Sequence, residues 1–99
     1  MSWQVYIIRC SDGSLYTGIS NDVERRWQQH VDRRGAKYFR GRKPVAVVYL
    51  EGAHDRSGAS RREAAIKRLQ RPEKEHLIAS STNELSAITQ LESQIYARQ

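Results

Sequence analysis

The chain has 99 residues, which is enough for one small domain with a modest core and too few for two. Hydrophobic residues make up 38% and charged residues 28% of the sequence, a balance that favours a soluble globular protein over a disordered one. The one cysteine excludes an intramolecular disulfide, and the lack of a leader-like or membrane-spanning apolar stretch predicts a cytoplasmic protein.

Positive charge is concentrated in two parts of the chain, which carries a net charge of +6. The first cluster lies beside two aromatic residues and comprises Arg33, Arg34, Lys37, Arg40, Arg42 and Lys43, with Tyr38 and Phe39. The second cluster comprises Arg61, Arg62, Lys67, Arg68, Arg71 and Lys74. Local clusters of this kind favour a polyanionic partner such as nucleic acid, and the alternative is an ordinary solvated surface.

The N-terminal residues predict a β-hairpin. Aromatic and β-branched residues over 3–8 and 15–19 are typical of strands. The Asp12-Gly13 pair between them is a common hairpin turn, so two antiparallel strands are expected here.

A helix, a loop and a third strand are expected next. Asn21 and Glu24 form a capping box, which opens a helix that runs to about Arg34. Residues 35–43 are expected to form a basic loop. Pro44 then leads into the sequence VAVVYL, whose β-branched residues predict a buried strand.

The second half of the chain predicts helices. Apolar spacing indicates a helix that starts near residue 55 and ends at Leu69, and Pro72 suits the first turn of another. A capping box at Ser81 opens a weaker helix towards Ile95. This order of elements predicts an α/β protein of the α+β type, with a small three-stranded antiparallel sheet flanked by helices.

Two polar residues lie where the first helix is expected to face the core. Val23 and Trp27 mark its inward stripe, and Arg26 and His30, also four positions apart, lie on or beside that stripe. A guanidinium and an imidazole in these positions could both contact one phosphate. The alternative is that Arg26 extends into solvent and His30 closes the edge of the core.

The later helix carries a carboxylate in a similar position. Glu63 falls between Ala59 and Ile66 on the inward stripe, where an unpaired charge is costly. If Ser60 began this helix, Glu63 would merely complete a capping box, but a start near residue 55 places it mid-helix. A single carboxylate suits Mg²⁺, which keeps several waters and accepts phosphate oxygens, and the histidines and the cysteine do not predict a zinc site.

Six positions form an ordered series along the chain: Tyr6, Tyr16, Gly18, Arg26, His30 and Glu63, with ten positions from the first tyrosine to the second and ten more to the arginine. The series resembles the GIY-YIG nuclease family, in particular its small stand-alone bacterial members. QVY stands where the family has GIY, YTG where it has YIG, ERRWQQH supplies the Arg and His, and REAAIKRL supplies the Glu. The match covers about residues 3–79.

The resemblance implies a GIY-YIG-like nuclease domain over residues 1–80, with residues 81–99 as a helical extension of the same domain or a partly ordered tail. Members of the family have a three-stranded antiparallel sheet with flanking helices, and they cleave phosphodiester bonds with one divalent metal ion. A metal-dependent endonuclease is therefore expected, acting on branched, nicked or single-stranded DNA, with RNA left open. The alternatives are a nucleic-acid-binding module that does not cut, and an interaction domain whose basic patch binds an acidic protein.

The resemblance also implies roles for the matched residues. Glu63 is expected to hold Mg²⁺ or Mn²⁺, and Arg26 to stabilise the negative charge that develops at phosphorus. Tyr6 is the first choice for taking the proton of the attacking water, with Tyr16 and His30 positioning it or the water. A free phenol has a pKa of about 10 and is a poor base at neutral pH, so this tyrosine needs neighbours that shift it.

Further residues are expected to contact nucleic acid. Gly18 would let the sheet backbone approach the substrate closely. Composition, rather than the family motif, suggests phosphate contacts for Lys37, Arg40, Arg42 and Lys43, and stacking on an unpaired base for Tyr38 or Phe39. No attached DNA-binding domain is visible, so specificity is expected from DNA shape or from a protein partner.

The sequence departs from the family pattern at three places. Gln4 and Thr17 replace the Gly and the Ile of the two tripeptides, at positions where change should be tolerated. Many members carry an asparagine some twelve to fifteen positions after the glutamate, but residues 75–78 contain none and Asn83 lies further on. The missing asparagine keeps the non-cutting alternative open.

A shared site requires Tyr6 and Tyr16 on one face of the sheet. A two-residue turn at residues 12–13 would put them on opposite faces, because side chains alternate along a strand. A three-residue loop over 12–14 would pair Cys10 with Tyr16 and put both tyrosines on one face. This second register, or an equivalent bulge, is predicted.

Overall fold

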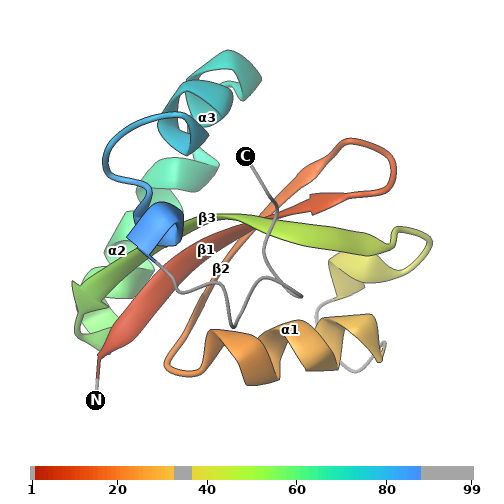
Figure 1. The fold of residues 1–99 in the computed structure, drawn as a ribbon, viewed down its shortest axis with the longest axis horizontal. Helices are drawn as coiled ribbons and strands as arrows, with labels where there is room; N and C mark the ends of the chain where they lie inside the picture. Colours follow the sequence, from red (N-terminus) through yellow and green to blue (C-terminus); the bar gives the residue numbers. More distant parts are fainter. Residues whose placement is uncertain (1, 33–36, 88–99) are drawn as a thin grey trace.

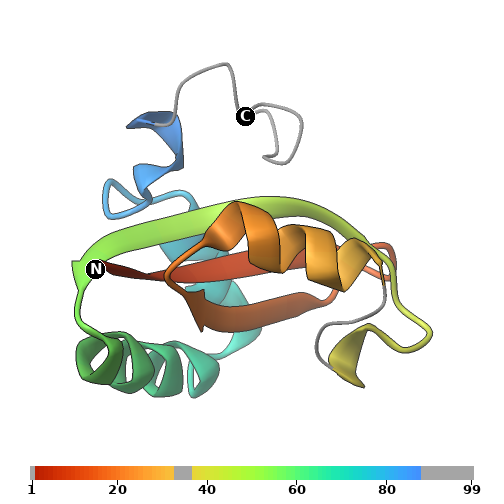
Figure 2. The ribbon, with the colours of Figure 1, turned by 90° about the horizontal axis from the view of Figure 1, so that it is seen from below.

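The computed structural model describes residues 2–32 and 37–87, and a three-stranded antiparallel sheet forms its middle layer (Figure 1). The strands, in the order β2-β1-β3, are β1 (Trp3–Cys10), β2 (Leu15–Ser20) and β3 (Pro44–His54). Helix α1 (Val23–Val31) covers one face, and helices α2 (Arg56–Lys67) and α3 (Arg71–Ile78) cover the other. Figure 2 shows α2 along the β2 side of the sheet. The predicted fold class is confirmed.

The central strand β1 is buried on both faces because each face carries a helical layer. Side chains alternate along the strand. Tyr6 and Ile8 pack with Trp27 of α1, whereas Val5 and Ile7 pack on the opposite face, beneath α2. This alternation directs Tyr6 towards α1, the helix that carries Arg26 and His30.

Aspartate side chains cap the two longer helices. Asp22 accepts a hydrogen bond of 3.1 Å from a backbone amide in the first turn of α1, so the predicted cap at Asn21 is wrong by one residue. Asp55 accepts one of 2.6 Å in the first turn of α2. Since α2 begins there, Glu63 lies mid-helix and does not form a capping box with Ser60.

The outer edge of β3 is closed by the side chain of Asn83. Its amide nitrogen donates to the backbone oxygens of Val48 (2.9 Å) and Ile78 (2.8 Å). Its oxygen accepts from the backbone amides of Leu50 (3.2 Å) and Leu85 (3.0 Å). One side chain thus satisfies two backbone groups of the edge strand, as a neighbouring strand would.

The predicted C-terminal helix falls partly outside the described residues. The chain turns at residues 81–82 and then forms a short 3-10 helix, Glu84–Ala87, so the predicted start at Ser81 is wrong. Residues 88–99, to which that prediction extended, lie outside the described part of the chain. Within residues 2–32 and 37–87, no helix is long and apolar enough to cross a membrane.

Candidate active site

The hairpin places both motif tyrosines on the α1 face of the sheet. Tyr6 lies opposite Gly18, and Tyr16 lies opposite Ile8. Paired residues of neighbouring strands share a face, and so do residues two positions apart on one strand, such as Tyr6 and Ile8. Both phenol rings therefore point to the same side of the sheet, with their centroids 6.2 Å apart. The predicted sharing of one face is confirmed.

The hairpin loop explains this register. The backbone amide of Cys10 donates to the backbone oxygen of Ser14 at 2.9 Å and encloses a three-residue loop over 11–13. Gly13 has a φ of +83°, the left-handed conformation that completes such a loop as a bulge. The loop has the predicted length but begins one residue earlier, so the predicted pairing of Cys10 with Tyr16 is wrong.

The Tyr6 hydroxyl and the imidazole of His30 form a buried hydrogen bond. The distance from Oη to Nε2 is 2.9 Å, and the two residues are 1% and 0% exposed. Burial, reinforced by Tyr16, raises the pKa of Tyr6 far above its usual range. Burial and the charge of Arg26 lower the pKa of His30 to about 4. At neutral pH both groups are therefore uncharged.

Gly18 provides the space that the two tyrosines occupy. A Cβ atom at this position would lie 2.6 Å from the hydroxyl oxygen of Tyr6 and 3.0 Å from Cε2 of Tyr16. A larger residue at position 18 would push the Tyr6 phenol away from His30. The glycine is thus explained by packing within the site, and its predicted contact with substrate stays a prediction.

The charges of Arg26 and Glu63 act on Tyr6 from helices on opposite faces of the sheet. The Arg26 guanidinium lies near enough to Tyr6 to oppose the rise of its pKa, and it donates to Oε1 of Gln29 at 2.9 Å. Glu63 is close enough that its charge also raises the pKa of Tyr6. Its Oε2 lies 3.3 Å from Nζ of Lys67, and its side chain is 23% exposed. The structure therefore brings Tyr16 and His30 into contact with Tyr6, and it places Arg26 and Glu63 near enough for their charges to act on the Tyr6 hydroxyl.

The donor set at this site fits one particular kind of metal ion. Within the described ranges, no three His, Cys, Asp or Glu side chains come together as a ready-made metal cluster. Glu63 is partly exposed, and its contact with Lys67 is a helical i, i+4 pair that an ion can replace. One carboxylate of this kind suits a hard ion such as Mg²⁺ or Mn²⁺, which keeps most of its waters or takes oxygens from a phosphate.

An aromatic cluster joins the site to the basic segment that follows α1. The ring of Phe39, in the 3-10 helix Lys37–Phe39, lies with its centroid 4.5 Å from that of His30 and 4.9 Å from that of Tyr16. Phe39 is buried, which leaves Tyr38 as the more accessible of the two rings predicted to stack on an unpaired base. Tyr38 is half-buried, and the guanidinium of Arg42 lies 4.2 Å from the centre of its ring.

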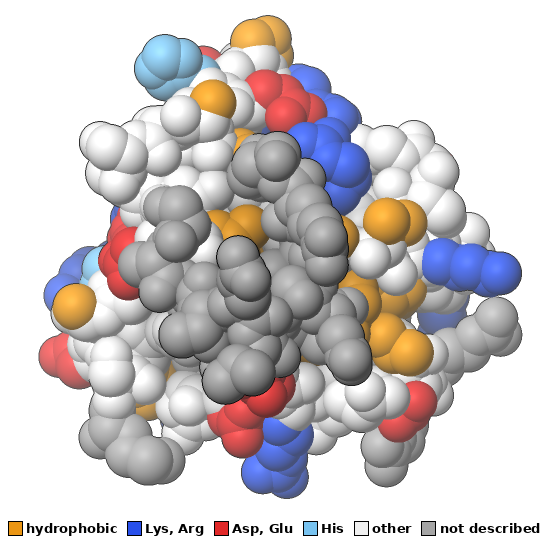
Figure 3. Space-filling view, in the orientation of Figure 1, with side chains coloured by type: hydrophobic (Ala, Val, Ile, Leu, Met, Phe, Trp, Pro, Cys, Tyr) orange, Lys and Arg blue, Asp and Glu red, His pale blue; other side chains and the backbone are white. Residues whose placement is uncertain are grey.

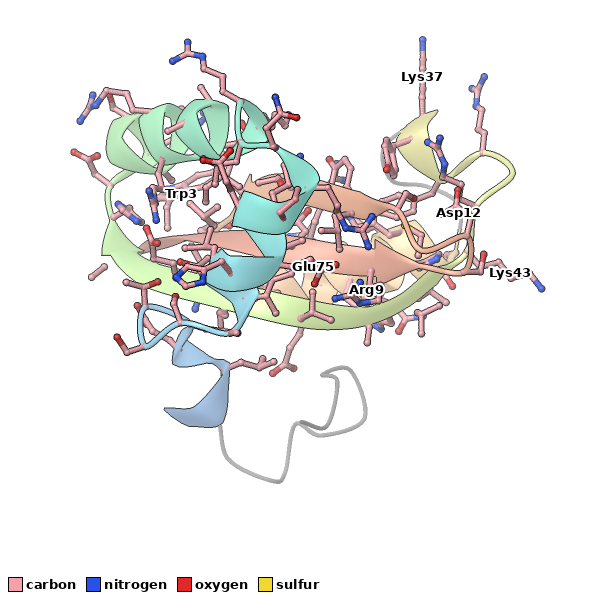
Figure 4. All side chains as sticks on the ribbon, turned by 90° about the horizontal axis from the view of Figure 1, so that it is seen from above. Trp3, Arg9, Asp12, Lys37, Lys43 and Glu75 are labelled. Carbon is pink, nitrogen blue, oxygen red and sulfur yellow. The ribbon has the colours of Figure 1, made fainter. Side chains whose placement is uncertain are left out.

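Three of the six basic residues of the second cluster, Arg62, Lys67 and Arg71, are paired with acids. Arg62 donates to both carboxylate oxygens of Glu51 at 3.0 Å, and Glu75 accepts from Arg71 and from Arg9 of β1. Acidic and basic side chains lie side by side at several places in Figure 3. Figure 4 shows Arg9 and Glu75 pointing towards each other. These pairs compensate much of the charge of the second cluster.

The first basic cluster is more open to solvent. Lys37, Arg40 and Lys43 are exposed, and the two lysines extend away from the protein in Figure 4. Arg42 forms a 2.9 Å ion pair with Asp12 at the hairpin tip, which partly offsets its charge. Arg33 and Arg34 lie outside the described residues.

Two departures from the family pattern have distinct structural consequences. Thr17, between Tyr16 and Gly18 on β2, points to the α2 face and is 3% exposed. Its hydroxyl makes no hydrogen bond within the described structure. It is tolerated at the cost of one buried polar group. Asn83 makes two of its four hydrogen bonds to the edge of β3 and the other two to Ile78 and Leu85, so it ties the segment after α3 to the sheet.

Sequence and structure comparisons identify relatives of the whole chain. The GIY-YIG catalytic domain profile matches residues 2–76. The UPF0213 protein DP2720 of Desulfotalea psychrophila is 48% identical over 88 residues, covering 88% of this chain and 80% of that protein. YhbQ of Escherichia coli K12 is 41% identical over 91% of this chain and 90% of its own length. The solution structure of the UPF0213 protein BH0048 of Bacillus halodurans has a TM-score of 0.55 at 39% identity, covering 93% of this chain and 98% of that one.

Proposed function

Because the chain belongs to the GIY-YIG family, we propose that it is a divalent-metal-dependent endonuclease that hydrolyses DNA phosphodiester bonds. The observation that carries the proposal is the buried Tyr6–His30 hydrogen bond, with Arg26 and Glu63 near enough for their charges to act on Tyr6. A cationic group, a carboxylate and a proton-accepting pair are the parts that phosphodiester hydrolysis requires. Packing alone would not require these charges beside a buried phenol.

Tyr6 acts as a proton relay in this proposal. Its raised pKa leaves almost no phenolate at neutral pH, so the phenol is not a base on its own. In the tautomer with the proton on Nδ1, Nε2 of His30 accepts the phenol proton, and the phenol oxygen then takes a proton from the attacking water. The negative charge of a bound phosphate favours the resulting imidazolium, against the opposing charge of Arg26.

Arg26 and Glu63 stabilise the charge that develops on the phosphate. The guanidinium of Arg26 lies beside the Tyr6 hydroxyl, where it would face the phosphate oxygens as water attacks. Mg²⁺ or Mn²⁺ held by Glu63 would supply Lewis-acid stabilisation of a phosphate oxygen and of the leaving group. Tyr16 packs against both Tyr6 and His30 and so limits the movement of each ring.

The substrate strand is held by the exposed cations of residues 37–43. Lys37, Arg40 and Lys43 flank the ring of Phe39, which touches the site, so phosphates near the scissile bond lie within their reach. Backbone contacts of this kind carry no sequence information. We therefore expect selection by DNA shape, at branched, nicked or single-stranded positions, or by a protein partner.

One observation favours a second candidate, a nucleic-acid-binding module that does not cut. Tyr6 and His30 are both buried, and a low pKa makes His30 a weak proton acceptor. Such a module would bind nucleic acid in a salt-sensitive way, without any effect of chelator on binding and without cleavage of any substrate.

The proposal is tested by cleavage of plasmid, nicked, branched and single-stranded DNA, and of RNA, with Mg²⁺ or Mn²⁺. Glu63→Gln and Arg26→Ala should each reduce the rate roughly 10²-fold or more, because each removes stabilisation of the transition state. The matched variants Glu73→Gln and Arg61→Ala, which change an acid of α3 and an arginine of α2, should cut like the wild type. Equal traces of product from wild type and Glu63→Gln would identify a contaminating nuclease and support the module that does not cut.

A further inference from the structure

Phe39 occupies a position that the nuclease motif does not account for. It belongs to the basic segment, between the exposed Lys37 and Arg40, yet its own side chain is 5% exposed. Its ring contacts His30 at a centroid distance of 4.5 Å and Tyr16 at 4.9 Å. A residue from the nucleic-acid-binding segment is therefore part of the wall of the active site.

The ring of Phe39 restricts how His30 can lie. The imidazole is held by Tyr6 at Nε2, by the edge of Tyr16 at a centroid distance of 5.4 Å, and by Phe39. A hollow of about 180 Å³ borders it, lined by His30, Val31, Phe39, Arg42, Lys43 and Pro44. Without the ring, this hollow would widen towards the imidazole, which would gain both water and freedom to rotate.

We propose that Phe39 is a positioning residue, which fixes the imidazole of His30 in line with the Tyr6 hydroxyl. Through Phe39, phosphate contacts made by Lys37 and Arg40 shift the buried imidazole, so that binding and chemistry are coupled. The coupling rests on the proposed nuclease function, whereas the positioning of His30 does not. Among the groups that face His30 are Tyr6, Tyr16, Phe39 and the charge of Arg26, with Arg42 and Lys43 across the hollow.

The first test is a pH titration of the histidine ring resonances by NMR, without nucleic acid. Phe39→Leu, which removes the ring, should raise the pKa of His30 from about 4 by ~1 pH unit or more, because burial is the main cause of its low value. Phe39→Tyr, which keeps the ring, should titrate like the wild type. Val48→Ala, a cavity variant in the core on the opposite face, is the control for general loosening. An unchanged pKa in Phe39→Leu, or an equal rise in Val48→Ala, would overturn the positioning role.

The second test uses the wild-type protein with a short single-stranded oligonucleotide and a chelator, so that no cleavage occurs. Binding should shift the ring resonances of His30 and leave those of His54, which bonds to Glu51 at 2.7 Å, in place. A bound oligonucleotide that leaves His30 unmoved refutes the coupling. In cleavage assays, Phe39→Leu should lower kcat roughly 10- to 100-fold with little change in KM, since it misplaces a reacting group without removing a phosphate contact.

If the protein cuts no DNA, the proposed function fails, and the titration of Phe39→Leu still decides whether Phe39 positions His30. If the titration shows no change while the wild type cuts, the positioning role fails and the nuclease remains. The cleavage assay therefore tests the proposed function, and the titration independently tests the positioning role of Phe39.

Discussion

Burial makes Tyr6 a weaker acid and His30 a weaker base, but it holds the two groups in a fixed relative position. Each group, taken alone, is made worse by the absence of water: the phenol holds its proton, and the imidazole resists gaining one. Held 2.9 Å apart, they would allow the phenol to pass its proton to the imidazole as it takes one from water in the proposed reaction, which leaves His30 charged. The residue that decides this geometry is Gly18, because any side chain there would meet the Tyr6 hydroxyl.

The pH dependence of stability should report His30. Its pKa is about 4 in the folded protein and about 6.5 when unfolded, so the unfolded chain binds the extra proton in the interval between them. The stabilisation is complete above pH 6.5 and is lost as the pH falls towards 4. Between pH 7 and pH 5, the free energy of unfolding should fall by roughly 2 kcal/mol more in wild type than in His30→Gln.

Denaturant unfolding at the two pH values measures this difference. The low pKa of Glu75, held at about 2 mainly by its hydrogen bond to Arg9, does not interfere, because its stabilisation is lost at lower pH. Parallel pH profiles for wild type and His30→Gln would show that the imidazole is not buried in its neutral form.

At the scale of elements, the sheet depends on two local devices that set strand positions. Gly13, in the left-handed conformation, is the third residue of the hairpin loop. A loop of three residues, rather than two, puts both tyrosines on one face of the sheet. At the other side of the sheet, the edge strand β3 has no neighbouring strand within the described residues, and Asn83 supplies the missing hydrogen bonds. The segment after α3 is thereby tied to the sheet.

Replacement of Asn83 should weaken the whole sheet. Asn83→Ala removes four hydrogen bonds and should lower the free energy of unfolding by about 2–3 kcal/mol. Asn21→Ala is the matched control: Asn21 is exposed, Asp22 caps α1 in its place, and the effect should stay within about 0.5 kcal/mol. Denaturant unfolding of both variants checks the prediction, and equal stabilities would mean that the edge of β3 does not need Asn83.

For the whole molecule, the distribution of charge matters more than its total. The net charge of +6 is partly compensated in the second cluster, where Arg62, Lys67 and Arg71 pair with Glu51, Glu63 and Glu75. Residues 37–43 carry exposed cations next to the site, and this segment is where phosphate binding should be concentrated.

Salt dependence of binding tests this distribution. Removal of one phosphate-binding cation should reduce the slope of log K against log salt by about 0.7–0.9, so Lys37→Ala/Arg40→Ala/Lys43→Ala should flatten it by about 2–3. The control Arg61→Ala/Arg68→Ala/Lys74→Ala removes the same number of positive charges from the second cluster. Fluorescence titration of a labelled oligonucleotide at several salt concentrations gives both slopes, and equal flattening would mean that binding follows net charge alone.

The sequence by itself determined the order of elements, the three-stranded sheet and the series of polar residues, because these depend on side-chain period, capping chemistry and spacing along the chain. Local signals were less reliable at boundaries: the cap of α1 is Asp22 and not Asn21, since neighbouring residues with similar propensities compete for one position. For the hairpin, the sequence predicted that both tyrosines share a face, but the predicted partner of Tyr16 was Cys10, whereas its partner is Ile8.

The tertiary structure decided what each of these residues touches. The bond between Tyr6 and His30 joins residues 24 positions apart, and no local pattern encodes the burial that gives both their pKa values. Phe39 reads as an exposed stacking residue in a basic loop, but the fold turns it inward against His30. Which arginines remain available for phosphate also depends on acids brought near by packing, because compensation of charge requires contact between distant segments.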